Sequence, residues 1–127
     1  MIGLRIASLI AVGAICGANL RYFVSDWFAR HYSASFPYGT LVVNATGSLL
    51  LGFFLIWTAD RVLASPHWRL VVAVGFCSSY TTFSSYSYET FRMIEQGHYG
   101  QAGANFLVNN LLCFGCVLAG AALARAI

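Results

Sequence analysis

Long apolar stretches with very few charges are the feature of this sequence that most limits how it can fold. Of its 127 residues, 59% are hydrophobic and 9% are charged, a balance typical of membrane proteins. A helix that crosses a bilayer needs about 20 mostly apolar residues, so the chain has room for four spans with short connections. Because lipid offers no hydrogen-bond partners, such segments must satisfy their backbone groups internally, as helices do. The sequence therefore predicts an all-α membrane protein.

The predicted spans form a single four-helix transmembrane domain over residues 1–127. Pro37 suits the first position of a helix, and Gly97 suits a helix end. Gly13 and Gly17 form a small-xxx-small pattern, which permits close contact between helices. The approximate ranges of the four spans are 3–28, 38–59, 68–96 and 99–125.

The third predicted span contains a dense run of hydroxyl side chains. Residues 78–90 read SSYTTFSSYSYET, in which eleven of thirteen side chains carry a hydroxyl. Hydroxyl and β-branched residues are weak helix formers, so we expect the backbone to unwind over residues 78–82. An unwound segment at membrane depth must be buried in protein or line a water-filled cavity. The third helix is therefore predicted to be broken near its middle.

The basic residues give the chain almost no preferred orientation. All seven are arginines. By the order of the spans, four lie on one side of the membrane and three at the other: Arg5, Arg61, Arg69 and Arg125, against Arg21, Arg30 and Arg92. The positive-inside rule depends on an asymmetry that this split lacks. Unless the split arises by chance, the chain inserts in both directions, and two copies pair antiparallel as inverted repeats do in transporters.

Several classes of function find no support in the residues. The four acidic side chains and three histidines form no nucleophile–base pair and no metal-ligand pattern. The arginines are scattered, whereas nucleic-acid binding needs a basic stripe. We therefore expect neither an enzyme nor a nucleic-acid-binding protein.

Uncharged polar side chains at membrane depth remain to be explained. Asn44 lies in the second predicted span, the hydroxyl run lies in the third, and Asn105 and Asn109 lie in the fourth. Their N–H and O–H groups can replace the hydration shell of a small anion, and the absence of a buried cation avoids trapping it. The alternative is that these groups only join helices, where each such bond contributes about 0.6 kcal/mol.

Two aromatic residues and one arginine add to this pattern. Phe83 and Tyr86 are three residues apart and share a helix face. The positive edge of an aromatic ring can hold an anion in a dry site, although core packing explains the same spacing. Arg21 ends the first span, where it either snorkels to the headgroups or raises the anion concentration at a pore mouth.

Three segments of the sequence resemble the Fluc (CrcB) fluoride channels. They are residues 17–22 (GANLRY), 37–44 (PYGTLVVN) and 75–89 (GFCSSYTTFSSYSYE). The resemblance extends over essentially the whole chain in length, span number and motif order. It implies a fluoride-selective channel that exports fluoride passively and reduces its toxicity in the cytoplasm. It also implies an antiparallel, dual-topology homodimer with two pores in the cell inner (plasma) membrane.

The resemblance also assigns roles to particular positions. A structural sodium ion at the dimer interface is expected on the main-chain carbonyls of Ser78 and Thr81. Arg21 matches the vestibule arginine. The pore aromatics and the polar lining fall on a larger set: Phe83, Tyr86, Asn44, Ser84, Ser87, Asn109, Asn105 and Cys113.

This chain departs from the family pattern at two places. Ser78 and Ser79 stand where the family usually has two glycines, and serine is stiffer than glycine. Tyr86 stands where the family usually has a second phenylalanine, so its hydroxyl either donates to the anion or blocks the path. The alternatives are a proton-coupled small multidrug exporter, for which Glu89 is the sole candidate carboxylate, and an assembly subunit whose polar face serves packing alone.

Overall fold

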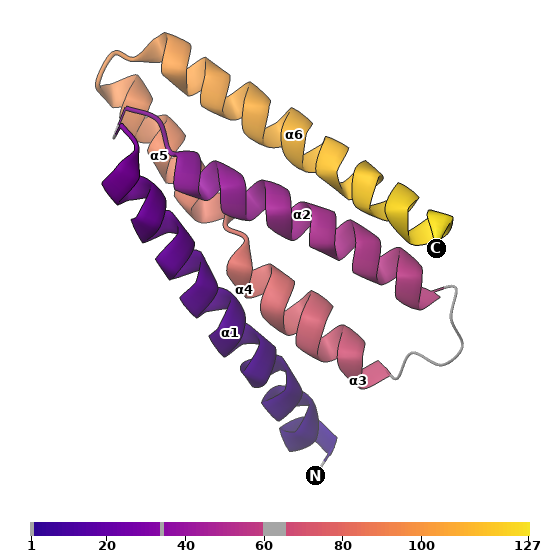
Figure 1. The fold of residues 1–127 in the computed structure, drawn as a ribbon. Helices are drawn as coiled ribbons and strands as arrows, with labels where there is room; N and C mark the ends of the chain where they lie inside the picture. Colours follow the sequence, from indigo (N-terminus) through magenta and orange to yellow (C-terminus); the bar gives the residue numbers. More distant parts are fainter. Residues whose placement is uncertain (1, 34, 60–65) are drawn as a thin grey trace.

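The chain forms helices that run roughly along one common direction (Figure 1). The computed structural model describes residues 2–33, 35–59 and 66–127. Three long helices are α1 (Ile2–His31), α2 (Tyr38–Ala59) and α6 (Tyr99–Ala126). Between α2 and α6 the chain is divided into four shorter elements: α3 (Pro66–Trp68), the π-helix η1 (Arg69–Cys77), α4 (Ser78–Tyr80) and α5 (Phe83–Glu95). Arg61, which the sequence placed at a membrane interface, lies outside the described residues.

Helices α1, α2 and α6 are each long and apolar enough to cross a membrane. Their ends lie within three residues of the ranges predicted from hydropathy, 3–28, 38–59 and 99–125. The fourth predicted range, 68–96, is occupied by an interrupted series of helices. Its second half is rich in hydroxyls, and a break divides it from the first half, so none of its pieces alone has the length of a span.

The break in this series lies at two threonines. Thr81 and Thr82 have extended backbone angles (φ −81°, ψ 158° and φ −150°, ψ 109°). The expected unwinding over residues 78–82 was too wide, because Ser78–Tyr80 stay helical. The amide of Thr81 still donates to the carbonyl of Cys77 at 3.0 Å, as in an α-helix. The series of α-helical backbone hydrogen bonds stops one residue later, where the Thr82 amide donates a hydrogen bond to a side chain on another helix.

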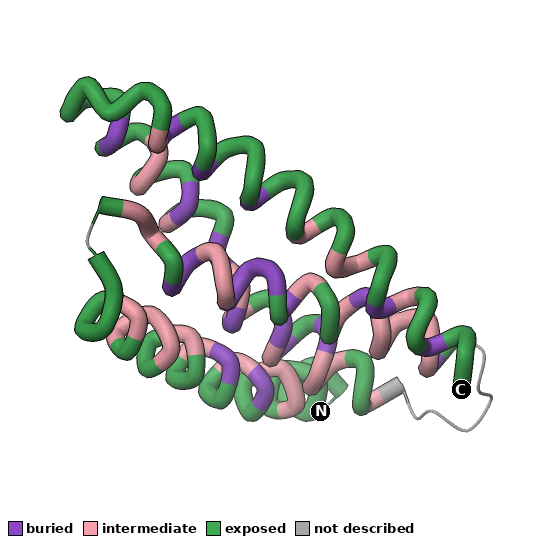
Figure 2. Tube along the Cα trace, turned by 45° about the horizontal axis from the view of Figure 1, so that its top comes forward, coloured by how far each residue is buried: buried purple, intermediate pink, exposed green. Residues whose placement is uncertain are grey.

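Glycine brings α1 into close contact with η1. Gly13 and Gly17 are buried, and a Cβ atom at either position would collide with backbone atoms of Val71 or Phe76. The close approach predicted from the small-xxx-small pattern is therefore confirmed. On the other side of the molecule, α2 packs most extensively on α6. Buried residues follow these inner faces, and the outer faces of α1 and α6 are exposed (Figure 2).

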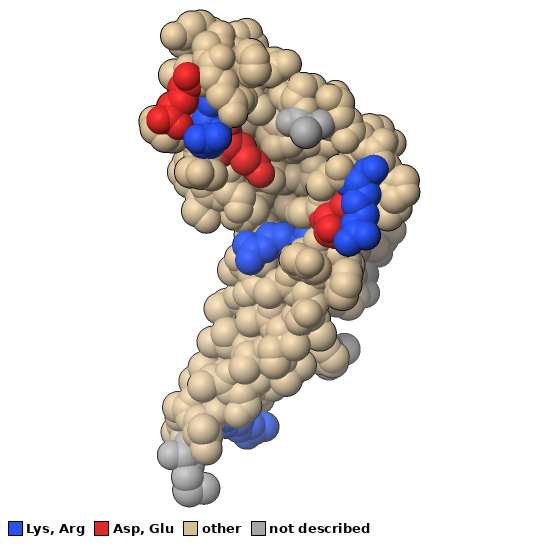
Figure 3. Space-filling view, turned by 90° about the vertical axis from the view of Figure 1, so that its left-hand side faces the viewer, with Lys and Arg blue, Asp and Glu red and all other residues tan. Residues whose placement is uncertain are grey.

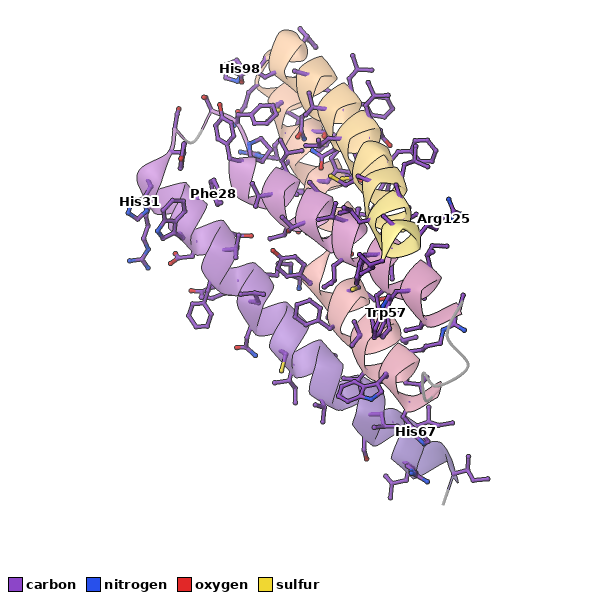
Figure 4. All side chains as sticks on the ribbon, turned by 45° about the vertical axis from the view of Figure 1, so that its right-hand side comes forward. Phe28, His31, Trp57, His67, His98 and Arg125 are labelled. Carbon is purple, nitrogen blue, oxygen red and sulfur yellow. The ribbon has the colours of Figure 1, made fainter. Side chains whose placement is uncertain are left out.

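The helices alternate in direction, so their ends gather at two ends of the molecule. Phe28, His31 and His98 lie toward one end, whereas Trp57, His67 and Arg125 lie toward the other (Figure 4). At the first end, α5 stops where predicted: Gly97 adopts φ +76°, and the amide of His98 reaches back to the carbonyl of Met93 at 2.8 Å. This 6→1 bond is typical of a glycine-terminated helix.

On one face of the molecule, charged side chains are unevenly distributed (Figure 3). Figure 3 shows acidic and basic side chains gathered over one half of the face that it presents, while the other half is almost free of charge. Among the described residues, ion pairs join Asp26 to Arg30 on α1 at 2.8 Å and Arg92 to Glu95 on α5 at 3.5 Å. Both pairs lie within one helical turn and are largely exposed, so they add little to stability.

Candidate functional site

Asn44 connects α2 to the break between α4 and α5. Its side-chain oxygen accepts a hydrogen bond from the amide of Thr82 at 2.7 Å, and its side-chain nitrogen donates to the carbonyl of Thr82 at 3.1 Å. Both residues are buried. The asparagine amide therefore pairs with the Thr82 backbone as a second peptide group would. It satisfies polar groups that the interrupted helix leaves open, which is a condition for irregular backbone at membrane depth.

Thr82 also caps the helix that follows it. Its Oγ1 accepts a hydrogen bond from the amide of Ser85 at 3.2 Å and donates to Oγ of Ser85 at 2.9 Å. A threonine at this position is a favoured N-cap. The backbone of Thr82 is thus held by α2, and its side chain starts α5.

A chain of amide and hydroxyl groups continues from Asn44 into α6. Asn44 Nδ2 donates to Oδ1 of Asn109 at 3.3 Å. Asn109 Nδ2 donates to Oδ1 of Asn105 at 2.8 Å and to its carbonyl at 3.2 Å. Asn105 Nδ2 then donates to Oγ1 of Thr90 at 2.8 Å. The three asparagines are buried, so the series links α2, α6 and α5 through uncharged groups.

A cavity of about 250 Å³ lies beside the break, and we call it the break cavity. It is bounded by α2, the break, the start of α5 and the middle of α6. The lining residues are Asn44, Gly47, Ser48, Leu51, Thr81, Thr82, Phe83, Tyr86, Asn109, Asn110 and Cys113. Among the described residues, no aspartate, glutamate, lysine or arginine belongs to this lining, so the cavity has amide and hydroxyl groups in its wall but no fixed charge.

The structure brings some of the sequence-predicted residues to this cavity and leaves others away from it. Asn44, Phe83, Tyr86, Asn109 and Cys113 line it. The rings of Phe83 and Tyr86 make an edge contact, with centroids 5.3 Å apart and planes at 62°. They differ in exposure, because Phe83 is 75% exposed and Tyr86 is 5% exposed.

The other predicted residues have different surroundings. Asn105 is fully buried behind Asn109. Ser84 and Ser87 lie on the exposed face of α5, and Ser84 Oγ is 3.3 Å from Oγ1 of Thr82. Arg21 is half-buried on α1 and belongs to the lining of neither cavity described here.

A second, larger cavity of about 570 Å³ lies near the end of the molecule where α1, α2 and α5 meet, and we call it the end cavity. Its lining includes Thr40, Glu89, Arg92 and His98. Oγ1 of Thr40 donates to Oε1 of Glu89 at 2.7 Å. The other carboxylate oxygen of Glu89 is buried and has no hydrogen-bond partner among the described residues.

The carbonyls of Ser78 and Thr81, expected to hold sodium, share one structural property. In a continuous helix their acceptor sites would be taken by the amides of Thr82 and Ser85. Here the first amide bonds to Asn44 and the second to the side chain of Thr82. Both carbonyls are therefore released from their helical donors. Carbonyl oxygens are suitable ligands for a hard cation, so these residues fit the expected group.

Three features of the site were missed by reasoning from the sequence. Asn110 contacts Tyr86, with Nδ2 2.9 Å from the tyrosine oxygen; a second asparagine next to Asn109 was the available signal. Thr82 caps α5 and pairs with Asn44 at the break, and threonine is a favoured N-cap residue. The Thr40–Glu89 bond joins residues 49 positions apart, and no local pattern indicates it.

The comparisons with known proteins agree with one another. A family model described as "CrcB-like protein, Camphor Resistance (CrcB)" matches residues 8–121. A protein named fluoride-specific ion channel FluC from Koribacter versatilis is 49% identical over 118 residues, covering 93% of this chain and 94% of that protein. Proteins of the same name from Sulfurihydrogenibium sp. and Roseiflexus sp. are 46% and 45% identical, covering 92% and 91% of this chain and 94% of each relative.

The fold and the site define the class of protein, and the comparisons define its family. Its apolar helices and uncharged buried site define a multi-pass α-helical membrane protein. Within that class, the chain belongs to the CrcB family, as the family match over residues 8–121 and the relatives at up to 49% identity establish.

Proposed function

We propose that this protein is a fluoride-selective channel that lets fluoride leave the cell passively and so limits its toxicity in the cytoplasm. The observation that carries the proposal is the uncharged break cavity, placed on a buried series of amide and hydroxyl groups that joins three helices. A small anion that sheds its water needs replacement donors, and it leaves again only if no buried cation traps it. The relatives named fluoride-specific ion channels support the choice of anion.

We further propose that the working unit is an antiparallel homodimer of dual topology in the cell inner (plasma) membrane. Exposed polar residues support this arrangement. Ser78, Ser84, Ser87 and Asn110 lie on outer surfaces of the described helices, where they would face lipid in a single copy of the chain. Polar groups in hydrocarbon are costly, and a second copy placed over these surfaces would remove them from lipid. A sodium ion on the carbonyls of Ser78 and Thr81 would then lie where two breaks approach each other.

The comparisons do not favour a proton-coupled multidrug exporter, because the relatives carry the name of a fluoride channel. Under either function, the role of Glu89 has to be explained. It lines the end cavity and accepts a hydrogen bond from Thr40.

Anion efflux from liposomes that contain the purified protein tests the proposal. Fluoride and chloride release are read with ion-selective electrodes, with and without a proton ionophore. We expect fluoride release without chloride release, with a rate that does not depend on a proton gradient. Release that requires the gradient would indicate a coupled exporter, and no release of either ion would contradict the channel assignment.

A further inference from the structure

We propose that the Tyr86 hydroxyl is an anion-binding donor in the break cavity, and that Asn110 is the residue that positions it. This inference rests on the proposed channel function and deepens it. Tyr86 is buried, with 5% of the residue exposed. The residue nevertheless lines the break cavity, and Asn110 lines it too.

The direction of the hydrogen bond between these residues determines where the tyrosine proton goes. The Asn110 Nδ2 group donates to the carbonyl of Phe106 at 2.7 Å and to Oη of Tyr86 at 2.9 Å. An amide nitrogen has two protons and accepts no hydrogen bond. The tyrosine oxygen is therefore the acceptor, and its own proton must point elsewhere. Among the described residues, no acceptor is in place for that proton.

The other amides at the cavity have no donor to spare. Nδ2 of Asn44 donates to Thr82 and to Asn109. Nδ2 of Asn109 donates twice to Asn105. These side chains therefore hold the backbone and one another, while the buried O–H of Tyr86 is left with no acceptor among the described residues. A buried donor without a partner is unfavourable unless a ligand or water completes it, and a desolvated anion completes it well.

Asn110 strengthens the donor, because accepting its hydrogen bond polarises the phenol and makes the O–H of Tyr86 a better donor. The ring of Phe83 makes an edge contact with the ring of Tyr86, and both residues line the break cavity. The site thus places one O–H group beside a pair of aromatic rings, and it suits a small anion such as fluoride. Asn110 is exposed on α6, and its side-chain nitrogen donates to Phe106 and Tyr86.

The test measures fluoride efflux from liposomes over a range of fluoride concentrations. It uses the full chain and the variants Tyr86→Phe, Asn110→Ala and the double variant, with Tyr99→Phe as the matched control. Tyr99 is exposed and lines neither cavity. We expect Tyr86→Phe to raise the half-saturating fluoride concentration about tenfold, as for loss of a bond to a charged group. The maximal rate should stay the same or rise, because an ion that is held less tightly leaves sooner.

The positioning role of Asn110 is tested by the combination of variants. Asn110→Ala should raise the half-saturating concentration several-fold in the wild-type background and leave it unchanged in the Tyr86→Phe background. An equal shift in both backgrounds would show that Asn110 acts independently of Tyr86 and would overturn the proposal. So would a Tyr86→Phe channel with an unchanged half-saturating concentration. If Asn110→Ala does not purify as a folded protein, Asn110→Ser provides the same comparison.

Failure of this inference differs from failure of the proposed function. A wild-type protein that releases no fluoride overturns the channel function, and the donor role falls with it. A wild-type protein that releases fluoride normally, with variants that saturate at the same concentration, overturns the donor role alone.

Discussion

The two sides of this molecule are held together by different means. On one side, α1 lies against η1 through buried glycines, Gly13 and Gly17, and no hydrogen bond joins their described side chains. On the other side, α2, α5 and α6 are joined by Asn44, Asn105 and Asn109. The first contact relies on backbone proximity, and the second relies on amide pairing.

This difference indicates that the glycine side supports the fold, whereas the amide side contains the functional site. In lipid, helices associate mainly by close packing of small residues, so the α1–η1 contact needs no polar group. Polar groups inside a membrane are expensive and tend to be kept where an ion or substrate passes. We infer that the glycine side fixes the first half of the interrupted series, while the amide side shapes the break. Variants on the two sides should therefore fail in different ways.

The largest effect is expected from Gly17→Leu. A side chain at this position would collide with the backbone of Phe76, which cannot move without separating α1 from η1. Overpacking a well-packed site typically lowers the free energy of unfolding by about 1–3 kcal/mol. Because the colliding atoms belong to rigid backbone, we expect a loss at the upper end of this range. We expect loss of the folded protein, measured by size-exclusion elution and thermal unfolding in detergent. Gly3→Leu, with open space around it, is the control; equal behaviour of the two variants would refute the packing argument.

The second prediction concerns Asn44→Ala. This change leaves the buried amide and carbonyl of Thr82 without their partner, a cost of about 1–3 kcal/mol for each group left unsatisfied. We expect fluoride efflux to be lost while the assembly stays intact on size exclusion. Asn19→Ala is the matched control, since Asn19 bonds only within α1. If Asn44→Ala instead dissociates the protein, the amide series serves packing, as in an assembly subunit.

A smaller effect is expected from Thr82→Ala. The variant removes the N-cap of α5, a loss of about 0.5–2 kcal/mol, but it keeps the Thr82 backbone and its pairing with Asn44. We expect a lower unfolding temperature and a partial loss of efflux. Thr82→Ser retains the capping oxygen and should restore both; failure to do so would mean that the methyl group matters more than the cap.

The smallest effect is expected from Thr81→Ala. The proposed sodium ligands at this position are carbonyls, and the Thr81 hydroxyl donates to the carbonyl of Cys77 within its own helical turn. Thermal stability in sodium, compared with stability in a large organic cation, should show the same sodium dependence as the wild type. If the variant loses that dependence while its assembly remains intact, the hydroxyl and not the carbonyl binds the ion.

The sequence predicted the helices better than the site. Hydropathy and helix-end residues such as Pro37 and Gly97 placed α1, α2 and α6 closely, because both signals are local. The hydroxyl run predicted a break, but one turn too broad, because the residue that ends the helical ladder is Asn44, 38 positions away from Thr82. Nothing in residues 69–77 indicates the π-helical geometry of η1.

Within the site, the sequence predicted which polar residues take part, but it did not predict their hydrogen-bond partners. Asn44 and Asn109 were recognised as polar groups at membrane depth, and both line the break cavity. Their hydrogen bonds could not be inferred, since these join helices whose relative rotation the sequence does not give. Ser84 and Ser87 share the composition of the run but lie on its exposed face. Asn110 adjoins Asn109 and yet reaches a different residue, because successive helix positions are rotated by about 100°.

Because Asn44 pairs with the Thr82 backbone, the channel depends on the position of Asn44 along and around the axis of α2. A single residue inserted into α2 ahead of Asn44 would turn the asparagine by about 100° and carry it 1.5 Å along the axis. The peptide of Thr82 would then face a valine, the residue before Asn44, instead of an amide. Substitutions on the outer face of α2 are tolerated by this geometry, but changes of its length are not. In descendants of this sequence, we therefore expect the amino acids of α2 to vary, while the number of residues from the start of α2 to Asn44 stays constant.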